Sequence, residues 1–165
     1  MELPTITRND TYRLFVRETG VLEANLQLDI ESGNTRGSER RHFGSCLGLK
    51  DGAEQTIYSI VLDASNQIQT DDQVVRNAVP PGRPLSHDEA EAVGHVISAM
   101  NKKNEEIIAQ TMSLLRQQLG EEDFAKLDAY IYQLENGGKK PAWPRPSTVC
   151  REDKCDPKKC IVPSN

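Results

Sequence analysis

The clearest pattern of apolar and polar positions in the chain begins at Ser86 and runs to Gly120. Apolar residues recur there every three or four positions, which is the period of an α-helix that buries one face. The main seam consists of Val93, Ile97, Met100, Ile107 and Leu114, and the polar residues Asn104 and Thr111 interrupt it. Ile108, Met112, Leu115 and Leu119 widen the stripe toward its end. We predict a helix over residues 87–119, roughly 50 Å long, that packs against two neighbours in a bundle.

Both ends of this helix carry local signals. Ser86 is a good N-cap, and Glu89 three residues later completes a capping box. Gly120 is typical of a helix C-cap. A second helix is expected to follow directly, because Glu121, Glu122 and Asp123 place three acids in a first turn. Its apolar positions are Phe124, Leu127, Ile131 and Leu134, and Gly137-Gly138 ends it. The short link predicts that the two helices pack antiparallel as a hairpin.

Two further amphipathic stretches lie upstream. Residues 10–31 predict a helix with a seven-residue repeat of apolar positions, although Gly20 lowers its helix propensity. The repeated positions are Leu14, Val21 and Leu28, then Phe15 and Leu22, with Leu26 and Ile30 extending the face. Residues 51–78 predict another helix. Its stripe is Ile57, Ile60, Val61, Ala64, Ile68, Val75 and Ala78. A short helix is expected within 36–50, ending near Gly44 to Gly48.

These elements define an all-α fold, an elongated bundle of about four main helices. The length of 165 residues fits one domain. We predict a helical bundle domain over residues 1–138 and an irregular, extended C-terminal tail over residues 139–165. The tail is rich in proline, at Pro141, Pro144, Pro146, Pro157 and Pro163.

Charge and hydropathy narrow the classes of partner. The formal net charge is −5, and lysine and arginine form no long block. Nucleic acid and anionic membrane surfaces are therefore disfavoured, since both are bound through basic surfaces. No apolar run approaches the roughly 20 residues that a membrane span needs. We expect a protein partner or self-association. In a self-assembled form, Asn104 and Thr111 are where the pairing register is expected to be set.

Four cysteines are the main candidates for chemistry: Cys46, Cys150, Cys155 and Cys160. An even number permits two disulfides with three possible connectivities. Disulfide pairing, within the tail or from the tail to Cys46, is favoured. The alternatives are free thiols, or a zinc or copper site in which Cys46 or His42 joins the three tail thiolates as the fourth ligand.

The cysteines also bear on the compartment. Disulfides persist in oxidising environments, so a periplasmic or extracellular protein is favoured over a cytoplasmic one. The N-terminus lacks the apolar stretch of a signal peptide. The exported interpretation therefore requires a mature chain.

The other polar candidates are interpreted as structural or solvated. His42 lies four residues before Cys46 and would share a helical face with it, but a solvated histidine is favoured. His87 and His95 are not expected to be ligands. The acidic pairs, such as Glu105 with Glu106, fit solvated helix faces. Trp143 is expected to dock on the bundle, with a role as a peptide anchor as the alternative.

Two resemblances accompany these patterns. The segment Leu85-Ser86-His87-Asp88-Glu89 through Leu119-Gly120-Glu121-Glu122-Asp123-Phe124-Ala125-Lys126-Leu127-Asp128 resembles uncharacterised exported helical proteins of soil bacteria, as does Cys46-Leu47-Gly48-Leu49-Lys50-Asp51-Gly52-Ala53-Glu54. The pattern is more distantly similar to periplasmic chaperones of the Spy and CpxP type. Their Leu-Thr-Pro-x-Gln turn corresponds here to Leu85-Ser86-His87-Asp88-Glu89. The resemblance implies an elongated helical protein.

No catalytic motif or cofactor signature occurs in the chain, so we expect no cofactor and a non-enzymatic role. The favoured hypothesis is an exported helical protein that acts through surface contacts as a structural, assembly or chaperone-like module, with its tail cross-linked by disulfides. The alternatives are a metal-binding protein that uses the tail thiolates and, least favoured, an enzyme whose site residues are separated in the sequence.

Overall fold

The computed structural model describes residues 7–33, 43 and 47–133. This part of the chain contains three helices, α1 (Arg8–Glu31), α3 (Ala53–Ala78) and α4 (His87–Gln133), and no strand. The all-α prediction is confirmed, and the predicted helix ranges agree closely with α1 and α3. Of the short helix predicted within 36–50, only residue 43 and residues 47–50 are described. The predicted tail, 139–165, lies outside the described residues.

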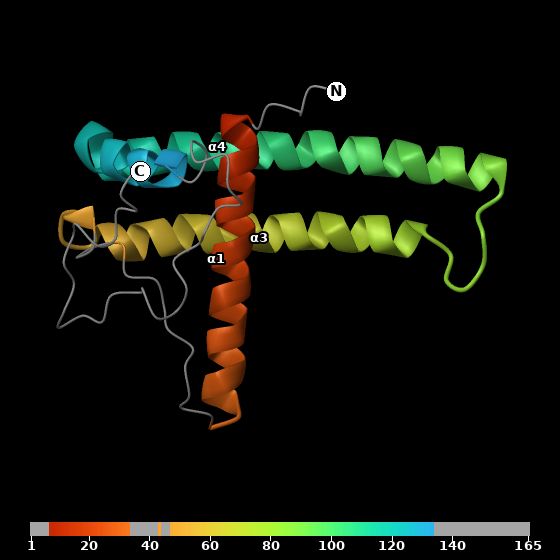
Figure 1. The fold of residues 1–165 in the computed structure, drawn as a ribbon, viewed down its shortest axis with the longest axis horizontal. Coiled ribbons are helices and arrows are strands. Elements are labelled where there is room, and N and C mark those ends of the chain that lie inside the picture. The colour runs from red at the N-terminus through yellow and green to blue at the C-terminus, as the bar shows by residue number, and fades with distance from the viewer. Residues whose placement is uncertain (1–6, 34–42, 44–46, 134–165) are drawn as a thin grey trace.

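The helices form an antiparallel pair with a third helix laid across it. α3 and α4 run side by side along the long axis of the molecule, joined by the loop between them (Figure 1). α1 contacts both and crosses them at a steep angle, and its C-terminal half extends past α3 (Figure 1). The part of the α3–α4 pair nearest the loop that joins the two helices projects beyond α1 (Figure 1). The shape is therefore elongated, as the helix lengths predicted.

The core lies at the end of the α3–α4 pair that α1 covers. The residues that share this core on the long pair include Ile57, Val61, Ala64, Ile68, Ile107, Ile108, Leu115 and Leu119. From α1 come Tyr12, Phe15 and Val16, and from the last turns of α4 come Phe124, Leu127, Tyr130 and Ile131. Four residues of the stripe predicted for residues 51–78 are therefore buried, and Ile60, Val75 and Ala78 are half-buried.

The structure corrects the predicted faces of α1 and α4. Leu14, Val21 and Leu28, the first seven-residue repeat, are exposed. The buried residues of α1 are Thr11, Tyr12, Phe15, Val16, Thr19 and Gly20. On α4, Ile97 and Leu114 of the predicted seam are also exposed. α1 packs through the face that carries Tyr12, Phe15 and Val16, so the row of Leu14, Val21 and Leu28 lies on the side of the helix away from the core.

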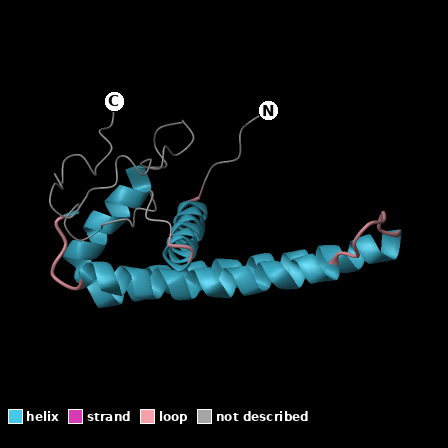
Figure 2. Cartoon of the chain, turned by 90° about the horizontal axis from the view of Figure 1, so that it is seen from below, coloured by secondary structure: helices cyan, strands magenta, loops and turns pink. Residues whose placement is uncertain are grey.

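α4 bends sharply at Gly120, the residue predicted to end a helix. Its φ of 78° and ψ of 166° are not helical, and only glycine adopts a positive φ there without strain. Beyond the bend, the last turns of α4 point back toward α1 (Figure 2). The Tyr12 hydroxyl donates to the Asp128 carboxylate at 2.7 Å, and Arg8 forms an ion pair with the same carboxylate. The predicted antiparallel hairpin is therefore a bend that closes against α1.

The acids after Gly120 have different roles. Glu121 and Glu122 are exposed, whereas Asp123 is only 1% exposed. Asp123 Oδ2 accepts from the backbone N–H of Lys50 at 3.0 Å, and Lys126 Nζ donates to the Gly48 carbonyl at 3.0 Å. These bonds tie the bend to the segment that precedes α3. Asp123 therefore has two roles. Its carboxylate accepts a hydrogen bond that holds the segment before α3, and its negative charge stabilises the start of the helical segment after Gly120.

The two polar interruptions of the α4 seam are buried within the chain itself. Asn104 is 1% exposed and Thr111 is 4% exposed. The Thr111 hydroxyl donates to the Ile107 carbonyl at 2.7 Å. Asp71 of α3 is also buried, and Lys103 Nζ donates to its Oδ1 at 2.5 Å. Asn104 and Thr111 are therefore covered in the folded chain and are not available to set the register of a second copy.

The capping box predicted at the start of α4 is confirmed. The Glu89 backbone N–H donates to Ser86 Oγ at 3.3 Å, and the Ser86 N–H donates to Glu89 Oε2 at 2.9 Å. Arg83 adds two bonds to the Glu89 carboxylate, at 2.8 and 2.5 Å. α1 begins with a similar box between Thr7 and Asp10, which the sequence analysis missed because its third helical position carries aspartate.

This cap predicts a specific acid sensitivity. Hydrogen bonding from Arg83, and then from the Ser86 backbone, lowers the pKa of Glu89 to about 2 from 4.5. A carboxyl group with a lowered pKa in the folded state stabilises the fold above its unfolded pKa, and that contribution is lost as the pH falls from about 4.5 through about 2. We expect the Glu89→Gln variant to lose less thermal stability than the wild type between pH 5 and pH 2 in melting curves recorded by circular dichroism. Equal slopes for the two proteins would contradict the assignment.

Candidate functional site

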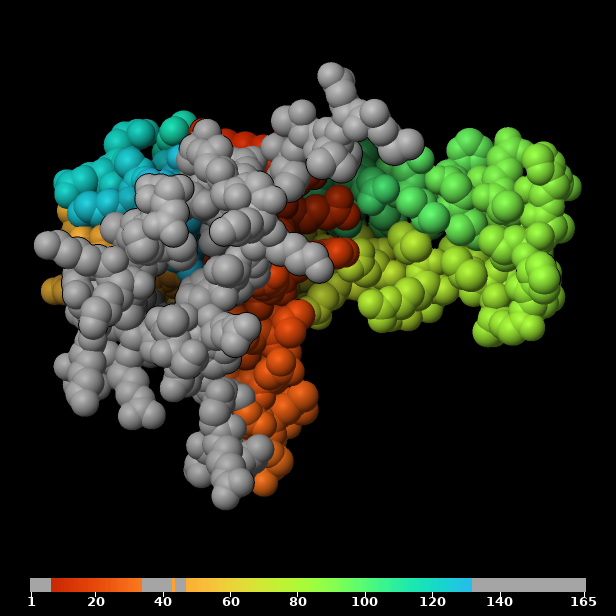
Figure 3. Space-filling view, viewed as in Figure 1, coloured from red at the N-terminus to blue at the C-terminus, as the bar shows by residue number. Residues whose placement is uncertain are grey.

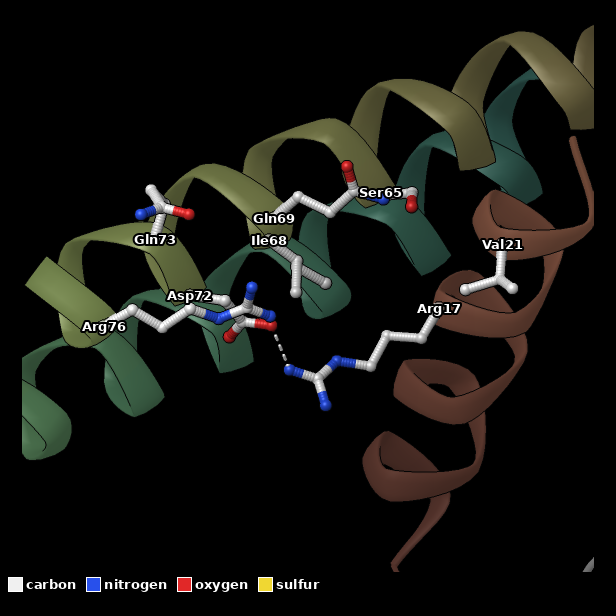
Figure 4. A pocket seen from close by; sticks show the side chains of 8 residues that line it. All are labelled: Arg17, Val21, Ser65, Ile68, Gln69, Asp72, Gln73 and Arg76. Carbon is white, nitrogen blue, oxygen red and sulfur yellow. Dashed lines mark hydrogen bonds and ion pairs between the residues drawn. The ribbon is translucent and has the colours of Figure 1, made fainter. Parts of the chain in front are cut away.

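A groove lies between α1 and α3, beside the point where the helices cross. Its volume is about 440 Å³. The lining residues are Arg17 and Val21 from α1, and Ser65, Ile68, Gln69, Asp72, Gln73 and Arg76 from α3 (Figure 4). This volume lies within the range of about 300–1,000 Å³ that is typical of ligand sites.

The groove exists because α1 and α3 meet at a glycine. Gly20 is buried against α3, and a Cβ atom built on it would lie 2.8 Å from the Cβ of Ser65. This separation is too short for two carbon atoms, so the backbone of α1 approaches α3 as closely as glycine alone permits. Because α1 then continues past α3 at a steep angle (Figure 1), the space in the corner next to Ser65 stays open.

The groove contains more positive than negative charge. Arg17 Nη2 lies 2.5 Å from Asp72 Oδ2, and this pair links the two helices. The Arg76 side chain extends along α3 toward Asp72 (Figure 4). Arg76 makes no side-chain hydrogen bond or ion pair with the described part of the chain. The groove therefore contains two guanidinium groups and one carboxylate, and only Arg17 pairs with that carboxylate.

The remaining lining combines amides with an apolar wall. Gln69 and Gln73 lie one turn apart on α3 and are exposed. Gln73 donates to the Asn77 side chain at 2.8 Å. Ile68 is almost fully buried and forms the floor, whereas Val21 is 53% exposed at the edge. The arrangement offers donors, acceptors and an apolar surface, but no nucleophile paired with a base.

A second hollow of about 480 Å³ lies at the start of α1, lined by Thr7, Arg8, Asn9, Asp10, Arg13, Glu105 and Ile108. Three of its four charged groups are already engaged within the chain. Asp10 belongs to the capping box, Arg8 pairs with Asp128, and Arg13 donates to Asn101 at 3.4 Å. Binding a ligand there would disrupt contacts that hold α1, so the α1–α3 groove is the better candidate.

The structure places few of the residues that the sequence analysis singled out. Cys46, Cys150, Cys155, Cys160, His42 and Trp143 lie outside the described residues. Disulfide pairing and the zinc or copper alternative therefore stay predictions. His87 and His95 are exposed on α4, and His95 Nε2 lies 3.8 Å from Glu91 Oε1. Among the described residues, no group of three or more histidine, cysteine, aspartate or glutamate side chains is placed to hold a metal ion.

The groove residues were not identified from the sequence. Arg17, Gln69, Asp72, Gln73 and Arg76 lie on the polar sides of amphipathic helices, where such residues usually contact only water. The one local signal was Gly20 in the middle of a helix, because a glycine there often marks a close approach. Helix propensity alone counts this glycine only as unfavourable for α1.

The chain matches no protein-family model, no curated protein and no solved structure. Within the described residues, no helix combines the length and the apolar character needed to cross a membrane.

Proposed function

We propose that the chain is a non-enzymatic helical module that acts through surface contacts with a protein partner. The observation that carries this proposal is the outward face of α1. Leu14, Val21 and Leu28 are 38%, 53% and 62% exposed. They are spaced by seven residues and so lie nearly in line on one face of the helix. We call these three residues the α1 stripe.

The α1 stripe does not contribute to the core of the described part of the chain. Tyr12, Phe15 and Val16 occupy the buried face of α1, and the stripe positions lie on the other side of the helix, where Val21 also borders the α1–α3 groove. Single exposed apolar residues are common on protein surfaces, but an ordered row along one helix is typical of a surface that another protein covers. Apolar anchors at helical spacing are also how helices recognise grooves and other helices.

The shape of the molecule supports the same function. The C-terminal half of α1 projects from the body as a single helix, and the space-filling view shows it standing apart from the α3–α4 pair (Figure 3). A projecting helix presents its apolar row without steric hindrance from the rest of the described chain. Export, disulfide cross-linking of the tail and an assembly or chaperone-like role are proposals that accompany this function.

The test is a comparison of two triple variants of the full-length protein. The stripe variant carries Leu14→Gln, Val21→Gln and Leu28→Gln. The control variant carries Val74→Gln, Ile97→Gln and Leu114→Gln, which are equally apolar and exposed at 44%, 39% and 45% on α3 and α4. Each is expressed in the native cells with a purification tag, cross-linked and analysed by quantitative mass spectrometry.

We expect the stripe variant to lose at least one partner, or its own cross-linked dimer, that the wild type and the control variant both retain. Circular dichroism spectra of the purified proteins would show whether each variant keeps the wild-type helix content. An identical set of cross-linked partners for all three proteins would overturn the proposal.

A further inference from the structure

We propose that the α1–α3 groove binds an acidic segment of the protein partner, with the carboxylate of a glutamate or aspartate side chain held between Arg17 and Arg76. This inference rests on the proposed function, because it names the chemistry by which the partner is recognised. The groove and the α1 stripe form one continuous surface, since Val21 belongs to the stripe and also lines the groove.

The charge of the groove favours a carboxylate. Two guanidinium groups reach it and only one carboxylate, that of Asp72, is present among its lining residues. Arg76 has no ion-pair partner in the described part of the chain. A guanidinium presents a planar fork of N–H donors that matches a carboxylate in a bidentate way. The groove therefore has one more positive than negative side chain, and a bound acidic side chain would supply the second carboxylate.

The existing ion pair does not prevent binding. The side chains of Arg17 and Asp72 are 45% and 31% exposed. Such exposed pairs contribute little to stability, so rearranging this one requires little free energy. A guanidinium has five N–H donors, and the 2.5 Å contact with Asp72 involves only one of its nitrogens. Arg17 therefore retains donors for a second carboxylate.

The open form of the groove favours a segment of a protein over a small molecule. Arg17, Val21, Gln69, Gln73 and Arg76 are all exposed, so the groove is accessible along its length. Small-molecule sites bury most of the ligand surface, which this groove cannot do. A peptide segment that runs along α3 would instead place its backbone beside the amides of Gln69 and Gln73, and an apolar side chain against Val21.

The experiment measures binding of a defined probe to the full-length protein by nuclear magnetic resonance. The arginine side-chain Nε–Hε signals of the ¹⁵N-labelled protein are assigned by substitution and followed during titration. The probe is the blocked dipeptide acetyl-Val-Glu-amide. The matched probe acetyl-Val-Gln-amide differs only in lacking the carboxylate, and inorganic phosphate serves as a third ligand that tests general anion binding.

We expect acetyl-Val-Glu-amide to shift the Arg17 and Arg76 signals saturably, and acetyl-Val-Gln-amide to leave them in place. Arg76→Gln should weaken binding of the acidic dipeptide about five-fold, the effect of losing one partly exposed ion pair. Arg83→Gln is the matched control, because Arg83 pairs with Glu89 outside the groove, and it should leave the affinity unchanged.

Either of two results would overturn the inference. One is the absence of a saturable shift of Arg17 and Arg76 with acetyl-Val-Glu-amide. The other is binding of inorganic phosphate as tight as binding of the dipeptide, which would show a general anion site. The proposed function is tested separately by the stripe variant. If the stripe variant loses a partner but the wild-type protein does not bind the dipeptide, the proposed contact function stands. Only the role of the groove in that contact is then rejected.

Discussion

Replacing Gly20 by alanine is expected to lower the free energy of unfolding by about 2 kcal/mol, the typical effect of forcing extra atoms into a packed contact. The added Cβ would lie 2.8 Å from the Cβ of Ser65 and closer still to its Oγ. Rotation of the Ser65 side chain relieves the contact with Oγ but not the one with Cβ. α1 and α3 must therefore move apart, which weakens the packing of Phe15 and Val16 beneath them.

The matched control for this prediction is Gly94→Ala. Gly94 is also helical, and a Cβ built there meets no atom within 4 Å. Alanine has a higher helix propensity than glycine, so this change should raise stability by up to about 1 kcal/mol. The same substitution thus has opposite signs at the two sites. Urea unfolding followed by circular dichroism measures both.

A second variant identifies the cause of the loss. Ser65→Gly removes both atoms that the new Cβ would meet, so Gly20→Ala in that background should be much less destabilising than in the wild type. A Gly20→Ala variant that is as stable as the wild type would show that the helices do not approach as closely as described. The groove beside the crossing would then lose its structural basis.

The largest loss from a single core residue is expected for Leu115→Ala, about 3 kcal/mol. Leu115 is 0% exposed and lies in the shared core. Truncation of a fully buried leucine to alanine removes apolar contacts and leaves a cavity, which typically lowers stability by about 2–5 kcal/mol. The loss should appear as a lower urea midpoint with an unchanged slope, because the same surface is exposed on unfolding.

The adjacent Leu114→Ala is the control. Leu114 lies on the same helix but is 45% exposed, so its truncation should change stability by only about 0.5 kcal/mol. The helix propensity terms are the same at both positions, and the difference between the two variants therefore measures burial. Equal losses at Leu114 and Leu115 would mean that α4 is rotated about its axis relative to the structure described.

Local signals were sufficient to locate the helices. The capping box at Ser86 and Glu89, and the glycine at 120, marked ends that the structure confirms. Such signals act within a few residues and do not depend on the rest of the fold. The same was true of the apolar stripe of α3, in which Ile57, Val61, Ala64 and Ile68 are buried, because α4 runs antiparallel beside it.

The buried face of α1 could not be predicted in the same way, whereas Phe124, Leu127 and Ile131, predicted for the last part of α4, are buried. Periodicity identifies which residues share a face, but it does not say which of two overlapping faces a neighbour will cover. Leu14 begins a seven-residue repeat of three apolar residues and Phe15 a repeat of only two, yet Leu14 is 38% exposed and Phe15 is 0% exposed. The crossing of α1 over α3 and α4 decides between them.

The sequence alone determined the all-α class and the start, end and amphipathic character of α1, α3 and the long first part of α4. Only the tertiary structure decided that Gly20 meets Ser65, that Asp123 holds the segment before α3, and that Arg17 and Arg76 reach one groove. The physical reason is the distance in sequence over which each kind of interaction acts. Helix caps and periodicity depend on residues within a few turns, whereas the groove joins residues that are more than 40 positions apart and become neighbours only when α1 crosses α3.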